Sequence, residues 1–369
     1  MVWGKQRGGI WLSWLLVTSG TIGLITGLAT GAGPKPPFGT MTTLSLLPAD
    51  PGFPEGIAVA GSRIYVSGPA RFGTAGTGPS AIQVLDRDTG VRLTTITVQG
   101  EALAFEHALS NVAVDGEGRV YALSTQLGLL RFVKQGAGYV QEYFGAPLPD
   151  LPAAATADPG EPSSPTAFDL PPIINDIVLD DAGYAYVTDS LQATIFRYSP
   201  AGGEPEIWLQ SAAFEGGGFL PFGTNGVRLD PAREFLYVAV TTSAANPLRG
   251  AIYRVPLTEF PDESQLELVH EYLASEGPDQ LAFGHDGTLY VSLAFVNQIS
   301  LLAPGIGELG RISSPPGADV PLDNPAALAF DSKSKSLLVA NHALLSGDPS
   351  HFAVLKIYVN DPGDPLSRP

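Results

Sequence analysis

The stretch that decides the fold is residues 174–190, which read INDIVLDDAGYAYVTDS. A polar pair, Asn175 and Asp176, precedes a short apolar segment, an acidic turn ending in Gly183, and a second apolar segment. Short apolar runs on either side of a turn with Asp and Gly are typical of two antiparallel strands. The stretch therefore predicts a strand–turn–strand unit that begins with polar residues.

Five further copies of this unit follow one another along the chain, spaced 45 to 64 residues apart. We call the polar residue that begins each copy its head, and the heads are Glu55, Asn111, Asn175, Asn225, Asp279 and Asn324. Repeats of this length, built from short strands and Gly turns, indicate the blades of a β-propeller. Because two more strands follow most heads, we predict an all-β fold, a six-bladed β-propeller with four-stranded blades.

The last blade lacks an outer strand in its own part of the sequence. After an apolar run at residues 352–358 the chain continues into Asp-Pro-Gly-Asp-Pro. A strand-like segment is available before the first head, at residues 40–47. We expect this N-terminal strand to complete the last blade and close the ring. The propeller then covers residues 40–360, and residues 361–369 form a C-terminal tail.

The composition fits such a fold and excludes several functions. The 369 residues include 43 Gly, 33 Pro and no Cys, and the net charge is −17. Many tight turns need Gly and Pro. The negative charge argues against nucleic acid and anionic membrane surfaces as partners. Without Cys there are no disulfides, thiolate metal sites or thiol nucleophiles.

The first 33 residues differ from the rest of the chain. Lys5 and Arg7 precede an uncharged run over residues 8–33. A positive start, an apolar centre and small residues at the end are typical of a signal peptide, and the run is also long enough for an N-terminal membrane anchor. Residues 34–39 are a Pro-rich spacer. Both interpretations predict an exported protein (secreted, periplasmic or otherwise extracytoplasmic) that touches a membrane only through an uncleaved N-terminal segment.

The heads are candidate ligands for a metal ion. The first strand of each propeller blade lines the central channel, so the heads converge near the axis on one face. Carboxylate and amide oxygens around a narrow axis suit a hard divalent cation, with Ca²⁺ as the expected one. The alternative for any single head is a turn-capping role, since Asn and Asp commonly begin strands in this way.

The head motifs resemble those of a known group of hydrolases. The motifs are Pro54-Glu55-Gly56, Asn175-Asp176, Asn225-Gly226 and Pro278-Asp279. They are similar to the channel motifs of the six-bladed, calcium-dependent gluconolactonase and regucalcin (senescence marker protein) family, and more distantly to those of paraoxonase and diisopropylfluorophosphatase. The resemblance implies that Glu55, Asn175, Asn225 and Asp279 hold the metal. It implies a substrate-binding role for Asn111, or a place in the metal shell through water.

The implied reaction is metal-assisted opening of a lactone or related ester, and it needs a base to activate water. Asp279 is one candidate. His107 and His342 are the others, because both lie in loops expected on the face of the heads. Asp189 ends a strand on this face, where it contacts substrate or caps a turn. No pair of histidines matches the dyad of paraoxonase.

These observations together predict a lactonase-like hydrolase with an axial divalent cation and a small-molecule lactone or ester substrate. The alternative from another class is a non-catalytic propeller that binds a ligand or a protein on the same face. A non-hydrolytic, strictosidine-synthase-like enzyme ranks third. Near the glycine run at 216–218, Phe214, Phe219 and Phe222 are expected either to line the channel mouth or to pack their loop against the ring.

Overall fold

The computed structural model describes residues 34–218, 221–367 and 369. The predicted signal or anchor at residues 1–33 lies outside these ranges. All the strands described below lie in one compact unit, Pro37–Pro369. Within the described ranges, no helix combines the length and the apolar character that a membrane crossing requires.

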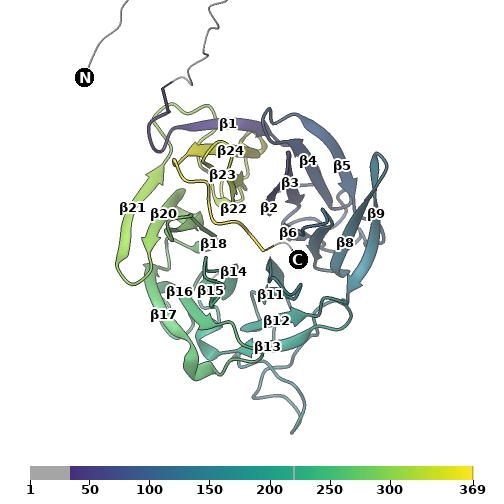
Figure 1. The fold of residues 1–369 in the computed structure, drawn as a ribbon. Coiled ribbons are helices and arrows are strands. Elements are labelled where there is room, and N and C mark those ends of the chain that lie inside the picture. Colours follow the sequence, from purple (N-terminus) through teal and green to yellow (C-terminus); the bar gives the residue numbers. More distant parts are fainter. Residues whose placement is uncertain (1–33, 219–220, 368) are drawn as a thin grey trace, which may run out of the picture. The chain divides into compact units, whose positions relative to one another are not determined.

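This unit is a ring of six antiparallel sheets with four strands each, as the sequence predicts (Figure 1). Blade one contains β2 (Ile57–Ala60), β3 (Arg63–Gly68), β4 (Ala81–Asp86) and β5 (Arg92–Thr97). Blade two contains β6 (Leu109–Val114), β7 (Val120–Ser124), β8 (Gly128–Gln135) and β9 (Gly138–Gly145). Blade three contains β10 (Ile174–Leu179), β11 (Ala185–Asp189), β12 (Thr194–Tyr198) and β13 (Glu206–Gln210).

The remaining blades follow in chain order around the ring. Blade four contains β14 (Thr224–Leu229), β15 (Phe235–Val240), β16 (Arg249–Pro256) and β17 (Glu267–Leu273). Blade five contains β18 (Pro278–Phe283), β19 (Leu289–Leu293), β20 (Gln298–Ala303) and β21 (Gly307–Ser313). Blade six contains β22 (Pro325–Asp331), β23 (Ser336–Asn341), β24 (Ala353–Tyr358) and β1 (Met41–Leu46). Short 3₁₀ helices lie in the connections at η1 (Ala212–Phe214), η2 (Glu263–Gln265), η3 (Ala294–Val296) and η4 (Pro349–His351).

The N-terminal strand closes the ring. β1 pairs antiparallel with β24, from Met41 opposite Ile357 to Leu46 opposite Ala353. Leu47, directly after β1, is buried between blades six and one. This confirms the predicted closure, which leaves β24 paired on both sides and makes β1 the outer strand of the blade.

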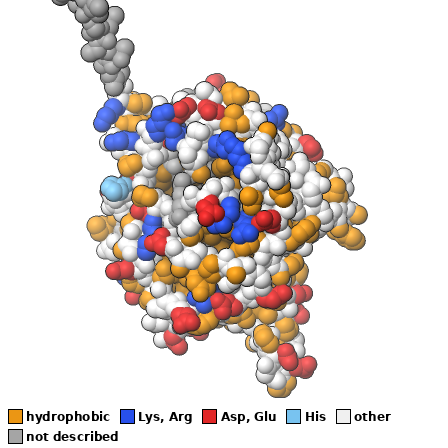
Figure 2. Space-filling view, turned by 45° about the vertical axis from the view of Figure 1, so that its right-hand side comes forward, with side chains coloured by type: hydrophobic (Ala, Val, Ile, Leu, Met, Phe, Trp, Pro, Cys, Tyr) orange, Lys and Arg blue, Asp and Glu red, His pale blue; other side chains and the backbone are white. Residues whose placement is uncertain are grey.

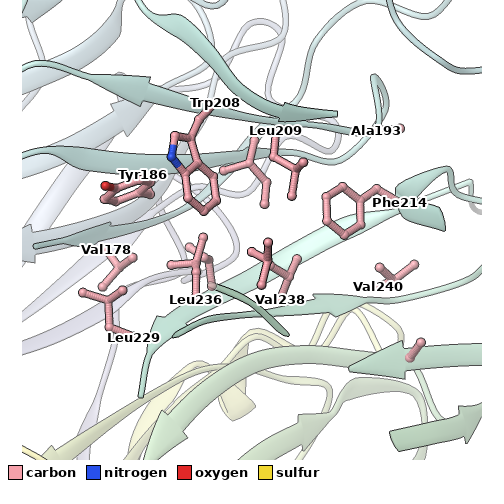
Figure 3. Close-up of a cluster of buried hydrophobic side chains, with 14 residues drawn as sticks. Val178, Tyr186, Ala193, Trp208, Leu209, Phe214, Leu229, Leu236, Val238 and Val240 are labelled. Atoms are coloured by element: carbon pink, nitrogen blue, oxygen red, sulfur yellow. The ribbon is translucent and has the colours of Figure 1, made fainter. Parts of the chain in front are cut away.

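Apolar side chains fill the space between neighbouring blades. In Figure 3, Trp208 and Leu209 of blade three lie over Leu236 and Val238 of blade four. The Tyr186 and Trp208 rings meet edge to face with their centroids 4.9 Å apart. Successive side chains of a strand point to opposite faces of the sheet. Strands such as β11 and β19 are buried at every position, so this part of each sheet is covered on both faces, whereas outer strands such as β5 and β17 are largely exposed.

Aspartates fix the turns at the end of the ring opposite the heads. Asp180 Oδ1 accepts hydrogen bonds from the backbone N–H groups of Ala182 and Tyr184, both at 2.9 Å. Asp115 and Asp230 act in the same way after β6 and β14. This local bonding explains the acidic residue that follows the first strand of these repeats.

The C-terminal tail crosses this same end of the ring (Figure 1). The Asp364 N–H donates to the Phe283 carbonyl at 2.8 Å, and the Gly116 N–H donates to the Pro369 carbonyl at 3.2 Å. Arg233 forms an ion pair with Asp364 at 2.7 Å. The tail thus bridges blades two, four and five and covers the channel on the side away from the heads.

Arg233→Ala is expected to destabilise the fold by about 1–2 kcal/mol, because it removes a partly buried ion pair and further bonds to the tail. Lys333→Ala is the matched control, since Lys333 and Asp88 form an ion pair with side chains that are 59% and 51% exposed. An exposed pair of this kind contributes about 0–1 kcal/mol. Chemical denaturation measures both variants, and equal losses would contradict the role given to the tail.

Charged side chains do not gather into one patch on the face shown in Figure 2. Acidic and basic groups lie interspersed there with apolar ones. The distinctive chemistry of the chain lies instead in the channel.

Candidate functional site

The innermost strands of blades two to five carry an irregularity at their heads. The register between the first and second strands shifts at Leu109/Val112, Ile174/Ile177, Thr224/Val227 and Pro278/Leu281. A β-bulge of this kind redirects a side chain out of the regular alternation. The bulges present four equivalent side chains, those of Ser110, Asn175, Asn225 and Asp279.

These side chains line one pocket at the mouth of the channel. Its polar floor consists chiefly of Glu55, Asn175, Asn225, Asp279, Asn324 and His342. The floor therefore brings together the four predicted metal ligands, which come from blades one, three, four and five. It also holds a fifth head and one of the two candidate histidines.

Several polar atoms on this floor have no hydrogen-bond partner. Within the described ranges, six buried side-chain nitrogen or oxygen atoms lack one. Four of the six belong to this floor, namely Glu55 Oε2, Asn225 Oδ1, Asn324 Oδ1 and His342 Nε2. Buried polar atoms are normally satisfied, and a cluster of unsatisfied ones calls for an explanation such as an ion. Three of these atoms are oxygens, so the donor set fits a hard cation.

Neighbouring groups orient the Asn225 side chain. Its Nδ2 donates to Thr241 Oγ1 at 2.9 Å, and Thr241 Oγ1 in turn donates to the Pro278 carbonyl at 2.9 Å. The amide nitrogen is thus held by blade four itself. The amide oxygen is left free as an acceptor on the pocket floor.

The ionised forms of the two carboxyl groups on the floor, Glu55 and Asp279, are disfavoured by their surroundings. Burial raises the pKa of Glu55 well above its usual value, and the charges of Asp279 and Asp176 raise it further. Burial and the charge of Asp176 also raise the pKa of Asp279, while Asn225 opposes the change. A cation placed between the two carboxylates would remove this repulsion.

His342 is a neutral imidazole in this setting. Burial lowers its pKa to about 3, although Asp323 acts in the opposite direction. Its Nε2 lies 3.2 Å from Glu55 Oε2, but the angles are not those of a hydrogen bond. The contact is therefore not an ion pair, and both atoms stay available to a third partner.

Asp176 occupies the channel beside the floor and ties three blades together. Its fully buried carboxylate accepts bonds from the N–H groups of Ile177 and Val227, both at 2.7 Å. It also accepts from the Asn111 amide and pairs with Arg228 at 3.0 Å. These contacts join β6, β10 and β14, so they set the positions of the neighbouring Asn175 and Asn225.

Asp176→Asn is expected to cost about 3–5 kcal/mol of unfolding free energy, because it leaves the buried Arg228 guanidinium without its counter-charge. Combining it with Arg228→Gln is expected to cost clearly less than the sum of the two single changes. Urea denaturation of the three variants measures this coupling. Additive losses would contradict a direct buried pair.

Three predicted site residues lie outside the pocket lining. Asn111 is buried one position beyond Ser110, the true equivalent of the other heads, and its amide holds Asp176. The two ring nitrogens of His107 lie 3.1 Å from the Phe105 carbonyl and 3.0 Å from the Gly78 carbonyl, so its ring fixes a loop.

Asp189, predicted to contact substrate or cap a turn, is fully buried. Its Oδ1 accepts from the N–H groups of Ile173 and Leu191, both at 3.0 Å, and Oδ2 accepts from Gln192 Nε2 at 2.6 Å. Burial raises its pKa to about 6. These contacts are those of the turn-capping alternative.

The aromatic residues near the glycine run separate into different places. Phe222 lines the pocket, whereas Phe214 is fully buried in the core between blades three and four. Phe219 lies outside the described residues. The sequence analysis did not single out the pocket residues Ser110, Thr241 and Phe72, which lie at the bulge of β6, directly after β15 and in the loop after β3.

The described residues contain no group of three or more His, Cys, Asp or Glu side chains that could hold a metal ion. A cation on this floor would therefore depend on amide oxygens beside the two carboxylates. Ca²⁺ accepts such mixed oxygen ligands, whereas Zn²⁺ sites are built mainly from imidazole and thiolate.

Solved structures of other proteins share this fold. Regucalcin from Agrobacterium tumefaciens, described as a calcium-binding protein, is 16% identical with a TM-score of 0.56, covering 90% of this chain and 98% of that one. A presumed gluconolactonase is 16% identical with a TM-score of 0.52, covering 88% and 99%. A luciferin-regenerating enzyme is 13% identical with a TM-score of 0.54, covering 89% and 98%. No family model and no curated protein matches the sequence. At these identities the likeness shows the fold alone, and it confirms the six-bladed propeller predicted from the repeats, which regucalcin and gluconolactonase share.

Proposed function

We propose that this chain is a lactonase-type hydrolase that opens a lactone or related ester at the channel mouth. The observation that carries the proposal is the set of unpartnered oxygens on the pocket floor beside two buried carboxyl groups with raised pKa values. The fold shared with regucalcin and gluconolactonase supports it.

Glu55, Asn175, Asn225 and Asp279 are the residues proposed to hold a divalent cation, and Ca²⁺ is the ion their oxygens fit best. When bound, such an ion polarises the carbonyl of an ester and stabilises negative charge on its oxygen. Asn324 lies at the same floor with an unpartnered oxygen, and we assign it to contact with substrate or with the ion.

Asp279 is the proposed general base that takes a proton from the attacking water. Its carboxylate lies on the pocket floor beside the other proposed cation ligands, where a water that attacks the ester would lie within its reach. His342 is less suited to this role, because a pKa of about 3 leaves little tendency to accept a proton. We therefore give His342 no proton-transfer role and assign it to the pocket floor beside Glu55.

Export is the proposed location, on the strength of residues 1–33 alone.

The test is turnover of a panel of lactones and aryl esters with and without a chelator. We expect hydrolysis that stops with chelator and returns when Ca²⁺ is added back. A chelator-insensitive reaction would contradict the cation's role. Absence of any turnover would favour the alternative, a propeller that binds a ligand on this face.

A further inference from the structure

The walls of the pocket differ in chemistry from its floor. Loops that rise above the heads supply the large apolar lining residues, which are Phe72, Ile173, Phe222, Phe295, Leu344 and Leu345. Phe72 and Leu345 are 38% and 57% exposed, whereas the side chain of Glu55 on the floor is 17% exposed. A ligand that enters must pass an apolar wall before its polar part reaches the floor.

Two aromatic rings meet across this wall. Phe72 follows β3 in blade one, and Phe222 precedes β14 in blade four. These blades lie on opposite sides of the ring (Figure 1), yet the two rings are only 5.9 Å apart between centroids, in an edge-to-face arrangement. The pair therefore spans the pocket above the floor.

The walls offer few partners for hydroxyl groups. Arg71 is the one Arg or Lys among the described lining residues, and it donates to the Pro172 carbonyl at 3.3 Å. A sugar lactone carries a hydroxyl on most of its carbons, and each hydroxyl left without a partner in an apolar setting costs binding energy. An alkyl chain or an aryl ring would instead bury apolar surface against these side chains.

We infer that the substrate is an ester or lactone that carries an apolar chain or ring, packed against the Phe72–Phe222 pair while its carbonyl group lies on the polar floor. This inference rests on the proposed hydrolase function and names its substrate class. The aromatic pair then acts as the specificity determinant of the site.

The experiment compares kcat/KM for three lactones in the presence of Ca²⁺. δ-Decalactone carries an alkyl chain, δ-valerolactone is the same ring without one, and glucono-δ-lactone carries hydroxyls. We expect δ-decalactone to exceed glucono-δ-lactone by at least about tenfold. Phe222→Ser is expected to lower the value for δ-decalactone by about tenfold while changing that for δ-valerolactone by less than about twofold.

Phe168→Ala is the matched control, because Phe168 is 72% exposed and does not line the pocket. Should Phe222→Ser fail to fold, Phe72→Ser tests the same contact from an exposed position. The inference is overturned if glucono-δ-lactone is the equal or better substrate, or if the folded variants leave the preference unchanged.

A result in which no lactone is hydrolysed would refute the proposed function, and calorimetric titration then decides the substrate class separately. Tighter binding of δ-decalactone than of glucono-δ-lactone would support the apolar wall. Equal or weaker binding would overturn it.

Discussion

Asp279→Asn is expected to lower kcat/KM for lactone hydrolysis by more than about 100-fold, because one side chain serves as proposed cation ligand and proposed base. The substitution keeps the size of the side chain and removes its charge. Loss of a residue that hydrogen-bonds a metal ligand lowers metal affinity or activity by about 10–100-fold, so loss of a direct ligand should lower them further.

The thermal stability of Asp279→Asn should not fall along with its activity. The pKa of Asp279 is raised because its charge is disfavoured by burial and by Asp176. Without cation, the neutral asparagine is therefore expected to leave the melting temperature unchanged or raise it. Wild type should gain stability on addition of Ca²⁺, since a ligand that binds the native state stabilises it, and the variant should not.

Asp286→Asn is the matched control for this prediction. Asp286 lies in the turn between β18 and β19 of the same blade, at the opposite end of the ring, where it accepts from the Thr288 N–H at 2.9 Å. We expect its activity and its response to Ca²⁺ to equal those of wild type. Wild-type activity in Asp279→Asn would remove this residue from the site.

Deletion of residues 41–47 is expected to cost at least about 5 kcal/mol, or to prevent folding. The deletion removes the ladder between β1 and β24 and the buried side chain of Leu47, whose burial alone contributes about 1.5–3 kcal/mol. It also leaves β24 as an unpaired edge, which promotes association between chains.

Thermal melting and size-exclusion chromatography test this prediction. Thr42→Ala and Thr43→Ala provide controls, because both side chains are exposed on β1 and their backbone pairing stays intact. Such surface changes are expected to stay within about 0.5 kcal/mol. A deletion variant that melts like wild type would contradict closure of the ring through β1.

The ring and most of the pocket floor could be predicted from the repeat pattern, because each unit contains the residues that determine its own turn and strands. Asp180 and Gly183 specify the turn, the apolar residues between specify two strands, and the same pattern recurs in the other blades. Glu55, Asn175, Asn225 and Asp279 share a position in that pattern, and the structure brings them into one pocket.

The second blade shows where the pattern becomes ambiguous. Ser110 and Asn111 are both polar and adjacent, and only the bulge between Leu109 and Val112 decides which of them faces the pocket. A shift of one residue in a strand reverses the side that each side chain faces, so taking Asn111 as the head in place of Ser110 puts the wrong side chain in the pocket.

Contacts between loops that are distant along the chain also could not be predicted from the sequence. His107 and His342 both lie in loops on the face of the heads, but one ring is held by two carbonyls and the other lies beside Glu55. The meeting of Phe72 and Phe222 depends on the closed ring. Their separation along the chain gives no indication of it.

Direct measurement of Ca²⁺ binding is the sharpest test of the central claim that the heads form a cation site. Isothermal titration of wild type, Glu55→Gln and Asp279→Asn would be compared under the same conditions. We predict one Ca²⁺ per wild-type chain, with binding weakened by more than about 100-fold in both variants. A wild-type chain that binds no Ca²⁺, or variants that bind it as wild type does, would contradict a cation site at the heads.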